Sequence, residues 1–172
     1  MDVLGLGLGH SKKRHIRDEN QSESFEDANL TTIDMDPGSS PDILMDLDVI
    51  TRGEKLPFPD ESFDEIHAYN FLEHIGRQGD WRGLFIEFGE YHRLLKDGGE
   101  MYILVPLHED SIADPGHTRF FHQNYFGFLN QGYNKDSTNG GTDYSWFWKK
   151  NFDIHFMQVT DKHHLAVILR KS

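Results

Sequence analysis

The stretch Val3-Leu4-Gly5-Leu6-Gly7-Leu8-Gly9 decides the fold of this chain. It reads as a short apolar strand that ends in three alternating glycines, and a carboxylate, Asp34, follows the next apolar segment. Glycine lets a ligand approach the backbone closely, and an acid at the end of the following strand can hold the two hydroxyls of a ribose. The combination predicts a nucleotide-type cofactor site in an α/β sheet.

Short apolar segments alternate with helical or loop segments in the rest of the chain, which is typical of a mainly parallel sheet covered on both faces. The expected strands lie near residues 2–6, 30–34, 42–45, 63–68 and 101–105. Apolar residues recur at helical spacing between Asp80 and Lys96, and Gly98-Gly99 can end that helix. We expect the apolar side of this helix to lie on the sheet.

The composition changes after residue 106 and becomes rich in histidine, aromatic residues, Asn and Gly. Gln123 to Leu129 is expected to form a short helix, and residues 135–142 a flexible loop. Alternating apolar residues near 152–156 and an apolar run at 164–169 then predict a closing antiparallel hairpin. We therefore predict one domain over residues 1–172, with a cofactor-binding core at 3–106, acceptor-side loops and a helix at 107–150, and a terminal hairpin at 151–172.

Composition excludes several classes of function. The 172 residues suit one domain, contain no cysteine and carry no apolar run of membrane-spanning length, so a soluble cytoplasmic protein without membrane contact is expected. A net charge of −12 repels polyphosphate, which makes nucleic acid an improbable partner. The exception is a basic cluster of Lys12, Lys13, Arg14 and Arg17, which is either a solvated face or a binding patch for an anionic group of the acceptor.

Three further segments follow the glycine turn in a characteristic order: Leu56–Ile66 (LPFPDESFDEI), Asn70–Ile75 (NFLEHI) and Tyr91–Pro106 (YHRLLKDGGEMYILVP). Together with the turn they resemble the class I S-adenosylmethionine-dependent methyltransferases, specifically the small type 11 group. The resemblance covers about residues 3–106 and is carried by the LPFPD-SFD, LEH and RLLK-GG signatures as a set.

The resemblance implies a Rossmann-like sandwich whose last strand is inserted between its neighbours in a C-terminal antiparallel hairpin. It implies S-adenosyl-L-methionine as cofactor and S-adenosyl-L-homocysteine as product. The methyl acceptor would be an O or N atom of a small molecule, sugar or peptide-like group. The implied cofactor residues are Gly5, Leu6, Gly7, Gly9, Asp34, Met35, Asp46, Leu47 and Asn70.

Within this assignment Asp34 would take the ribose hydroxyls, which its ionised carboxylate can accept in charge-assisted hydrogen bonds. Asp46 and Leu47 would border the adenine, and Asn70 would lie near the sulfur. A nicotinamide dehydrogenase is the competing interpretation, but it would need a glycine at the position of His10.

Three features depart from the family pattern. Val3 stands where an acid usually precedes the first glycine, Leu6 replaces a small residue, and the N-terminal helix that commonly roofs the acceptor pocket is missing ahead of the first strand. These departures motivate an alternative function, a non-catalytic S-adenosylmethionine-binding regulatory or assembly subunit. An oligomer is compatible with the sequence.

Histidines supply the candidate catalytic groups, because an acceptor hydroxyl or ammonium must lose a proton and imidazole has a suitable pKa. His74 follows the fourth expected strand. His117 lies in Asp114-Pro115-Gly116-His117-Thr118-Arg119, which resembles the DPxHxR segment of phage-associated and bacterial members of the group. Asp114 could orient the imidazole of His117.

A metal-assisted O-methyltransferase is a rival mechanism within the class, in which a glutamate and histidine of an E-x-x-E-H pattern bind a divalent ion. Asn70 replaces the first acid of that pattern, whereas Glu73, His74 and either His108 or His117 remain available as ligands. A divalent metal is therefore compatible with the sequence, but no metal site is predicted.

Overall fold

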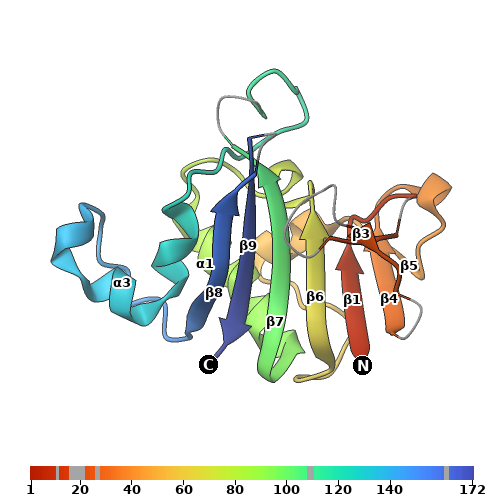
Figure 1. The fold of residues 1–172 in the computed structure, drawn as a ribbon, viewed down its shortest axis with the longest axis horizontal. Helices are drawn as coiled ribbons and strands as arrows, with labels where there is room; N and C mark the ends of the chain where they lie inside the picture. Colours follow the sequence, from red (N-terminus) through yellow and green to blue (C-terminus); the bar gives the residue numbers. More distant parts are fainter. Residues whose placement is uncertain (11, 16–21, 26–27, 108–110, 161–162) are drawn as a thin grey trace.

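The structure is a computed structural model, and it describes all residues except 11, 16–21, 26–27, 108–110 and 161–162. It contains a seven-stranded sheet with the order β5-β4-β1-β6-β7-β9-β8 (Figure 1). Strands β5 to β7 are mutually parallel, and β9 is antiparallel to both its neighbours. The strands of this sheet are β1 (Asp2–Leu6), β4 (Asn29–Asp34), β5 (Ile43–Leu44), β6 (Phe63–Tyr69), β7 (Leu95–Pro106), β8 (Phe152–Val159) and β9 (His164–Lys171).

This topology is the Rossmann-like one predicted from the sequence, with the final strand inserted beside β7. The chain leaves β1 toward β4 and β5 on one side and returns to β6 and β7 on the other, so the order of connection reverses between β1 and β6. Open α/β sheets bind their ligands beyond the carboxyl ends of the strands at such a point. The fold therefore places a site where β1, β4, β6 and β7 end.

Helix α1 (Trp81–Leu94) lies behind the sheet in the view of Figure 1. Asp80 begins it, since its side chain accepts a hydrogen bond from Gly83 N at 3.0 Å. The expected end at Gly98-Gly99 is wrong: the helix stops at Leu94, and fully buried Leu95 already pairs with Phe63 in the sheet. The two glycines instead lie in an irregular stretch of β7, where Gly98 has a φ of +75°.

The segment after β7 also differs from its predicted form. Residues Tyr125–Leu129 form a 3-10 helix (η4) in place of the expected helix over 123–129. The backbone turns at Asn130, whose side chain accepts from the N–H groups of Gly132 and Tyr133 and so starts the short helix α3 (Gln131–Lys135). The expected loop at 135–142 contains a 3-10 turn, Ser137–Asn139. Among the described residues no helix has both the length and the apolar character needed to cross a membrane.

The main core lies between the sheet and the layer formed by α1, η4 and the 3-10 helix Leu47–Arg52 (η2). Its centre is aromatic: the rings of Phe85 and Trp148 stack 5.4 Å apart, and Trp148 stacks in turn on Phe152 of β8. The buried indole N–H of Trp148 donates a hydrogen bond to Leu129 O at 2.8 Å. This packing joins the C-terminal hairpin to the cofactor half of the sheet.

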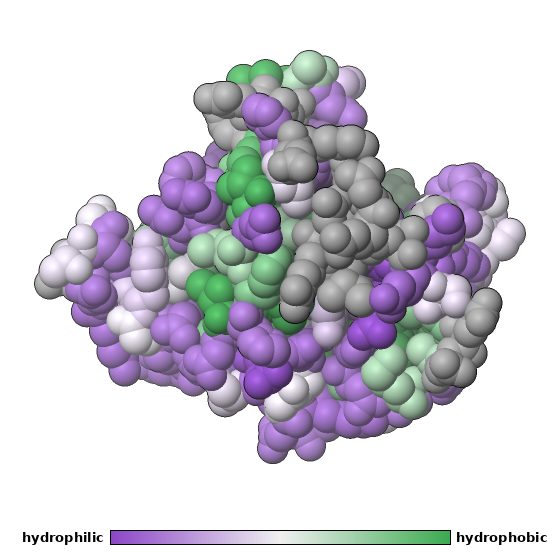
Figure 2. Space-filling view, viewed as in Figure 1, coloured by the Kyte–Doolittle hydropathy of each residue, from purple (hydrophilic) through white to green (hydrophobic). Residues whose placement is uncertain are grey.

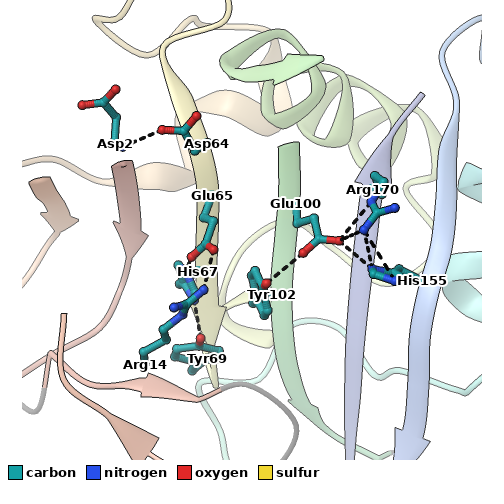
Figure 3. A network of polar contacts seen from close by, with 10 residues as sticks. All are labelled: Asp2, Arg14, Asp64, Glu65, His67, Tyr69, Glu100, Tyr102, His155 and Arg170. Carbon is teal, nitrogen blue, oxygen red and sulfur yellow. Dashed lines mark hydrogen bonds and ion pairs between the residues drawn. The ribbon is translucent and has the colours of Figure 1, made fainter. Parts of the chain in front are cut away.

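The opposite face carries a buried polar network (Figure 3). Arg14, from the short strand β2 (Arg14–His15), pairs with Glu65 of β6, and the carboxylate of Glu65 also accepts a hydrogen bond from His67 Nε2 at 2.8 Å. The other ring nitrogen of His67 bonds the hydroxyl of Tyr69, and its ring stacks on Tyr102 at 4.7 Å. Burial lowers the pKa of His67 below its usual value, so the neutral imidazole fits this place.

An apolar cluster adjoins this network on the same face. Figure 2 shows a largely polar surface on which apolar atoms gather over β8 and β9. The buried members of the cluster are Tyr69, Tyr102, Leu104, Ala166 and Ile168. These side chains are at most 8% exposed, but no described helix lies in front of β8 and β9 in Figure 1, so the expected covering of both faces is not seen over these two strands.

Candidate functional site

The glycine turn lies at the carboxyl end of β1. Gly7 N donates to Ile33 O of β4 at 2.9 Å, and both Gly7 and Gly9 have φ values near the left-handed region, +59° and +57°. A Cβ on Gly7 would lie 2.3 Å from Cδ2 of Phe71, so that position requires glycine for its backbone conformation and for the packing of this ring.

Asp34 at the end of β4 is bound to this turn. Its Oδ2 accepts from Gly9 N at 3.1 Å, and its Oδ1 accepts from Asp36 N at 2.9 Å. Each oxygen keeps further acceptor capacity, because an ionised carboxylate has about four lone-pair sites. The structure thus brings the glycine turn and the predicted ribose-binding acid together and fixes the orientation of the carboxylate.

A narrow crevice lies between the turn and the end of β4, and it leaves no room for a water molecule in this structure. Lys12 lies along it and donates from Nζ to Ser40 O at 2.8 Å. In the basic cluster, Lys12 is therefore occupied by a backbone carbonyl and Arg14 by Glu65, while Arg17 lies outside the described residues. Two members of the cluster are engaged within the protein, which weakens the case for an anion-binding patch.

The other predicted cofactor residues fall into two groups. Leu6 and Leu47 are buried in the main core at 0% and 3% exposure, so only their backbone could face a ligand. Met35 is 70% exposed beside Asp34, and exposed Asp46 accepts from Asp48 N at 2.9 Å, where it begins η2. Gly5 is covered by the side chain of Leu8, and a Cβ there would lie 2.4 Å from that leucine.

Asn70 lies at the carboxyl end of β6, next to the point where the strand order reverses. Its φ of +48° is unusual for a residue other than glycine, and its N–H donates to Leu104 O of β7 at 2.7 Å. The strained backbone turns the chain from the sheet into the 3-10 turn Leu72–His74 (η3). Asn70 therefore adjoins the residues of the second, larger cleft.

That cleft is open and has a volume of about 690 Å³. It is bounded by the end of β6, the turn η3, the end of β7, the loop that follows β7 and the start of β9. Figure 1 shows this loop projecting beyond the carboxyl end of β7 at the top of the view. The lining residues are Asn70, Glu73, His74, Pro106, Ala113, Asp114, Pro115, His117 and His164.

The two predicted catalytic histidines lie together in this cleft, with ring centroids 4.7 Å apart and planes at 76°. The Nδ1 atom of His74 lies 3.2 Å from Gly116 O, and that of His117 lies 3.0 Å from Ser111 O. A carbonyl can only accept, so each imidazole donates from Nδ1 and, when neutral, carries its lone pair on Nε2.

Asp114 has a different role from the predicted one. Its Oδ2 lies 3.5 Å from His117 Nε2, which is too long for a good hydrogen bond, and its Oδ1 accepts from Gly116 N at 2.7 Å. The Ser111 carbonyl, rather than Asp114, orients the imidazole of His117. Asp114 shapes the loop and adds negative charge near Nε2.

Glu73 is the residue of this cleft that the sequence did not single out, except as a conceivable metal ligand. It is 1% exposed, and neither carboxylate oxygen has a hydrogen-bond partner in the described structure. Burial raises its pKa from the ordinary 4.5 to about 7, while its own backbone N–H and the charge of Arg119 pull the other way. Its place beside His74 in a three-residue turn was the available signal.

The raised pKa of Glu73 makes stability depend on pH. The folded state holds this proton more tightly than the unfolded state, so stability falls as pH rises from about 4.5 to about 7. The loss reaches up to about 3 kcal/mol above that range. Charged or titratable neighbours are Asp114, which raises this pKa, Arg119, which lowers it, and the imidazoles of His74 and His117.

We therefore expect Glu73→Gln to be more stable than the parent protein near pH 8 and equally stable near pH 4.5. The measurement is urea unfolding at several pH values, with EDTA present so that bound cations do not contribute. Glu54→Gln, at an exposed glutamate, serves as the control and should follow the parent profile. Parallel profiles for Glu73→Gln and the parent would contradict the assigned pKa.

The cleft is supported from behind by a buried ion pair. Arg119 bonds Glu87 of α1, at 2.6 Å from Nη1 to Oε2, and donates from Nε and Nη2 to Leu72 O at 3.1 and 2.6 Å. The backbone N–H groups of Thr118 and Arg119 both donate to Glu73 O. These bonds attach the loop that carries His117 to the turn that carries Glu73 and His74.

The remaining candidate, His108, lies outside the described residues. Of the pair His163-His164, His164 lines the cleft.

Comparison with known proteins identifies the family and the fold. Residues 18–103, half of the chain, match the family described as Methyltransferase domain. A search of curated proteins gave no match.

Solved structures resemble the whole chain. A SAM-dependent methyltransferase of Methanosarcina mazei is 16% identical with a TM-score of 0.56, covering 99% of this chain and 92% of its own. The 1,6-didemethyltoxoflavin-N1-methyltransferase of Burkholderia thailandensis, solved with 1,6-didemethyltoxoflavin and S-adenosylhomocysteine, is 16% identical with a TM-score of 0.60, covering 99% and 71%. A SAM-dependent methyltransferase of Archaeoglobus fulgidus is 12% identical with a TM-score of 0.60, covering 99% and 86%.

At these identities the solved structures establish the fold, and the family match establishes the membership. The likeness to the solved structures covers the overall fold of the chain. The chain belongs to the methyltransferase-domain family and has the Rossmann-like class I methyltransferase fold.

Proposed function

We propose that this protein transfers a methyl group from S-adenosylmethionine to an O or N atom of a small molecule, sugar or peptide-like acceptor. The observation that carries the proposal is Asp34, which is held against the glycine turn at the end of β4 by Gly9 N and Asp36 N. The relative from Burkholderia thailandensis, which acts at a nitrogen and was solved with S-adenosylhomocysteine, supports this choice of cofactor and of acceptor atom.

The residues present suit such a cofactor. Asp34 would accept the two ribose hydroxyls, because its carboxylate is already oriented and keeps free lone pairs. The backbone of Gly5, Gly7 and Gly9 would pass along the methionine half, and Asn70 would lie near the sulfur. Asp46 and the backbone of Leu47 would border the adenine, while Leu6 belongs to the glycine turn and Met35 follows Asp34.

The acceptor would occupy the 690 Å³ cleft that begins at Asn70. When bound, S-adenosylmethionine supplies an electrophilic methyl group on a sulfonium. The protein then holds the acceptor atom in line with that methyl group, which can supply much of the rate acceleration. An acceptor O–H or N–H proton must also leave, and His117 and His74, which line the cleft, offer Nε2 lone pairs as bases, with Asp114 beside His117.

Replacement of Asp34 tests the cofactor site. We expect Asp34→Ala to weaken S-adenosylmethionine binding about 10–100-fold, since hydrogen bonds to a charged acceptor contribute about 1.5–3 kcal/mol. Isothermal titration calorimetry measures the effect. Asp143→Ala is the matched control, because that exposed aspartate also accepts a backbone N–H, from Ser145, but lies away from the crevice. Unchanged affinity in Asp34→Ala would contradict the proposed cofactor site.

The alternative, a non-catalytic S-adenosylmethionine-binding regulatory or assembly subunit, is favoured by Val3. This side chain is fully buried at the position where the family usually has an acid, so the methionine end of the cofactor lacks one polar anchor. The two functions differ in product. Incubation with a metabolite pool yields S-adenosylhomocysteine if the protein is an enzyme, whereas binding without product over a broad acceptor set indicates the subunit.

A further inference from the structure

We propose that Glu73, His74 and His117 bind a divalent transition-metal cation, of which Zn²⁺ is the representative, at the wall of the acceptor cleft. The assignment departs from the sequence analysis, which predicted no metal site. Binding itself is independent of the proposed function, whereas the role suggested for the cation in methyl transfer rests on it.

The positions of the three side chains carry the proposal. Glu73, His74 and His117 each offer one potential ligand atom, a carboxylate oxygen or a ring nitrogen, and these three atoms lie within 4.8 Å of one another. Three ligands about 2.1 Å from one tetrahedral cation lie about 3.4 Å from each other, so the most distant pair would close by up to about 1.4 Å on binding. The residues come from two adjacent segments, η3 and the loop after β7, which are bonded to each other through Glu73 O.

Backbone carbonyls fix the tautomer of both histidines. Their Nδ1 atoms are engaged by the Gly116 and Ser111 carbonyls, at 3.2 and 3.0 Å, which leaves Nε2 of each as the lone pair. Histidine ligands of metals commonly donate their other ring N–H to a backbone carbonyl in this way, since the bond fixes the tautomer and the ring orientation.

Glu73 supplies the second, independent observation. It is 1% exposed, and both carboxylate oxygens lack hydrogen-bond partners among the described residues. A buried carboxylate without partners is costly, and a cation would supply both the missing contact and the missing charge. The nearest cationic side chain, Arg119, is already committed to Glu87 and the Leu72 carbonyl.

The donor set selects the class of cation. Two imidazole nitrogens and one carboxylate suit Zn²⁺ and neighbouring transition metals, whereas Mg²⁺ and Ca²⁺ prefer sites built from oxygen ligands. Three protein ligands leave at least one coordination position open, and the open side is the cleft. Asp114, with Oδ2 3.5 Å from His117 Nε2, adds negative charge at the same place.

In methyl transfer, positive charge beside an acceptor hydroxyl would favour loss of its proton to Asp114 or to water. The new O–CH₃ bond would then form as the C–S bond of the sulfonium breaks, with the electron pair passing to sulfur. No oxidant or reductant is needed. In the metal-loaded protein His117 would be a ligand and not the base.

Metal binding is measured directly with tag-free full-length protein that has been treated with EDTA and dialysed. Zn²⁺ is titrated in competition with a chromophoric chelator, and Co²⁺ is titrated while its visible absorption bands are followed. We expect one tight equivalent, with Glu73→Gln and His117→Ala each weakening it at least about tenfold. His122→Ala is the control, because His122 is exposed and does not line the cleft.

Circular dichroism shows whether each variant is folded. If His117→Ala does not fold, the near-isosteric Glu73→Gln still tests the proposal. Absence of tight binding, or tight binding that survives in Glu73→Gln, would overturn the proposal. The two proposals fail separately: calorimetry with S-adenosylmethionine reports on the cofactor site, and turnover that persists with EDTA would remove the catalytic role of the cation while leaving the methyltransferase function intact.

Discussion

Replacing His117 with alanine should lower methyl transfer about 10²–10⁴-fold and leave the affinity for S-adenosylmethionine unchanged. The factor is the usual contribution of a positioned general base. Cofactor binding should persist because the Asp34 carboxylate is held by the backbone N–H groups of Gly9 and Asp36. Neither residue forms a hydrogen bond with the described part of the loop after β7. Turnover is followed as S-adenosylhomocysteine release, and affinity by calorimetry.

His155→Ala provides the comparison for this experiment. That histidine is half exposed on the far strand β8, where it pairs with Glu100 and Arg170, and its loss should leave turnover unchanged. Equal loss of turnover and cofactor affinity in His117→Ala would indicate a structural role. Turnover of the parent protein with EDTA distinguishes a base at position 117 from a metal ligand. If His117 is a base alone, EDTA leaves turnover unchanged.

The second large effect concerns Arg119, whose replacement by methionine should cost about 3–5 kcal/mol of stability. Removal of one partner of a buried ion pair leaves an uncompensated charge, here Glu87 at 0% exposure. The Leu72 carbonyl would lose two donors at the same time. Urea unfolding followed by tryptophan fluorescence measures the difference.

Two further variants give this result its meaning. Arg170→Met removes a half-exposed cation that pairs with Glu100 and should cost less than about 1 kcal/mol. The double variant Arg119→Met/Glu87→Met should recover part of the loss, because no buried charge is then left unpaired. If Arg119→Met were no more destabilising than Arg170→Met, the buried pair would not support the cleft as described.

Local patterns in the sequence were sufficient for most of the fold. Glycine turns, short apolar strands and their alternation with other segments predict a mainly parallel sheet, and the family resemblance implied the insertion of the last strand. The end of α1 was not predictable in this way. Gly98-Gly99 is a good helix terminator, but burial of Leu95 in the sheet ends the helix earlier, and that burial is a tertiary effect.

The candidate site was also predicted only in part, because tertiary contacts decide which of its residues lie together. The sequence named His74 and His117, and the structure places both in one cleft, which their separation along the chain does not reveal. Glu73 was named only as an available metal ligand, because its burial without partners is a property of the folded chain. The role given to Asp114 belongs to the carbonyl of Ser111, and main-chain groups leave no signature in a sequence.

The placement of β9 between β7 and β8 has a consequence for synthesis. Every residue from Glu100 to Pro106 is paired with this strand, so a ribosome-bound chain that ends before residue 164 presents two long unpaired edges, on β7 and on β8. Such edges are templates for association with other chains. The nascent polypeptide is therefore open to association with other chains until β9 has emerged and paired with both strands.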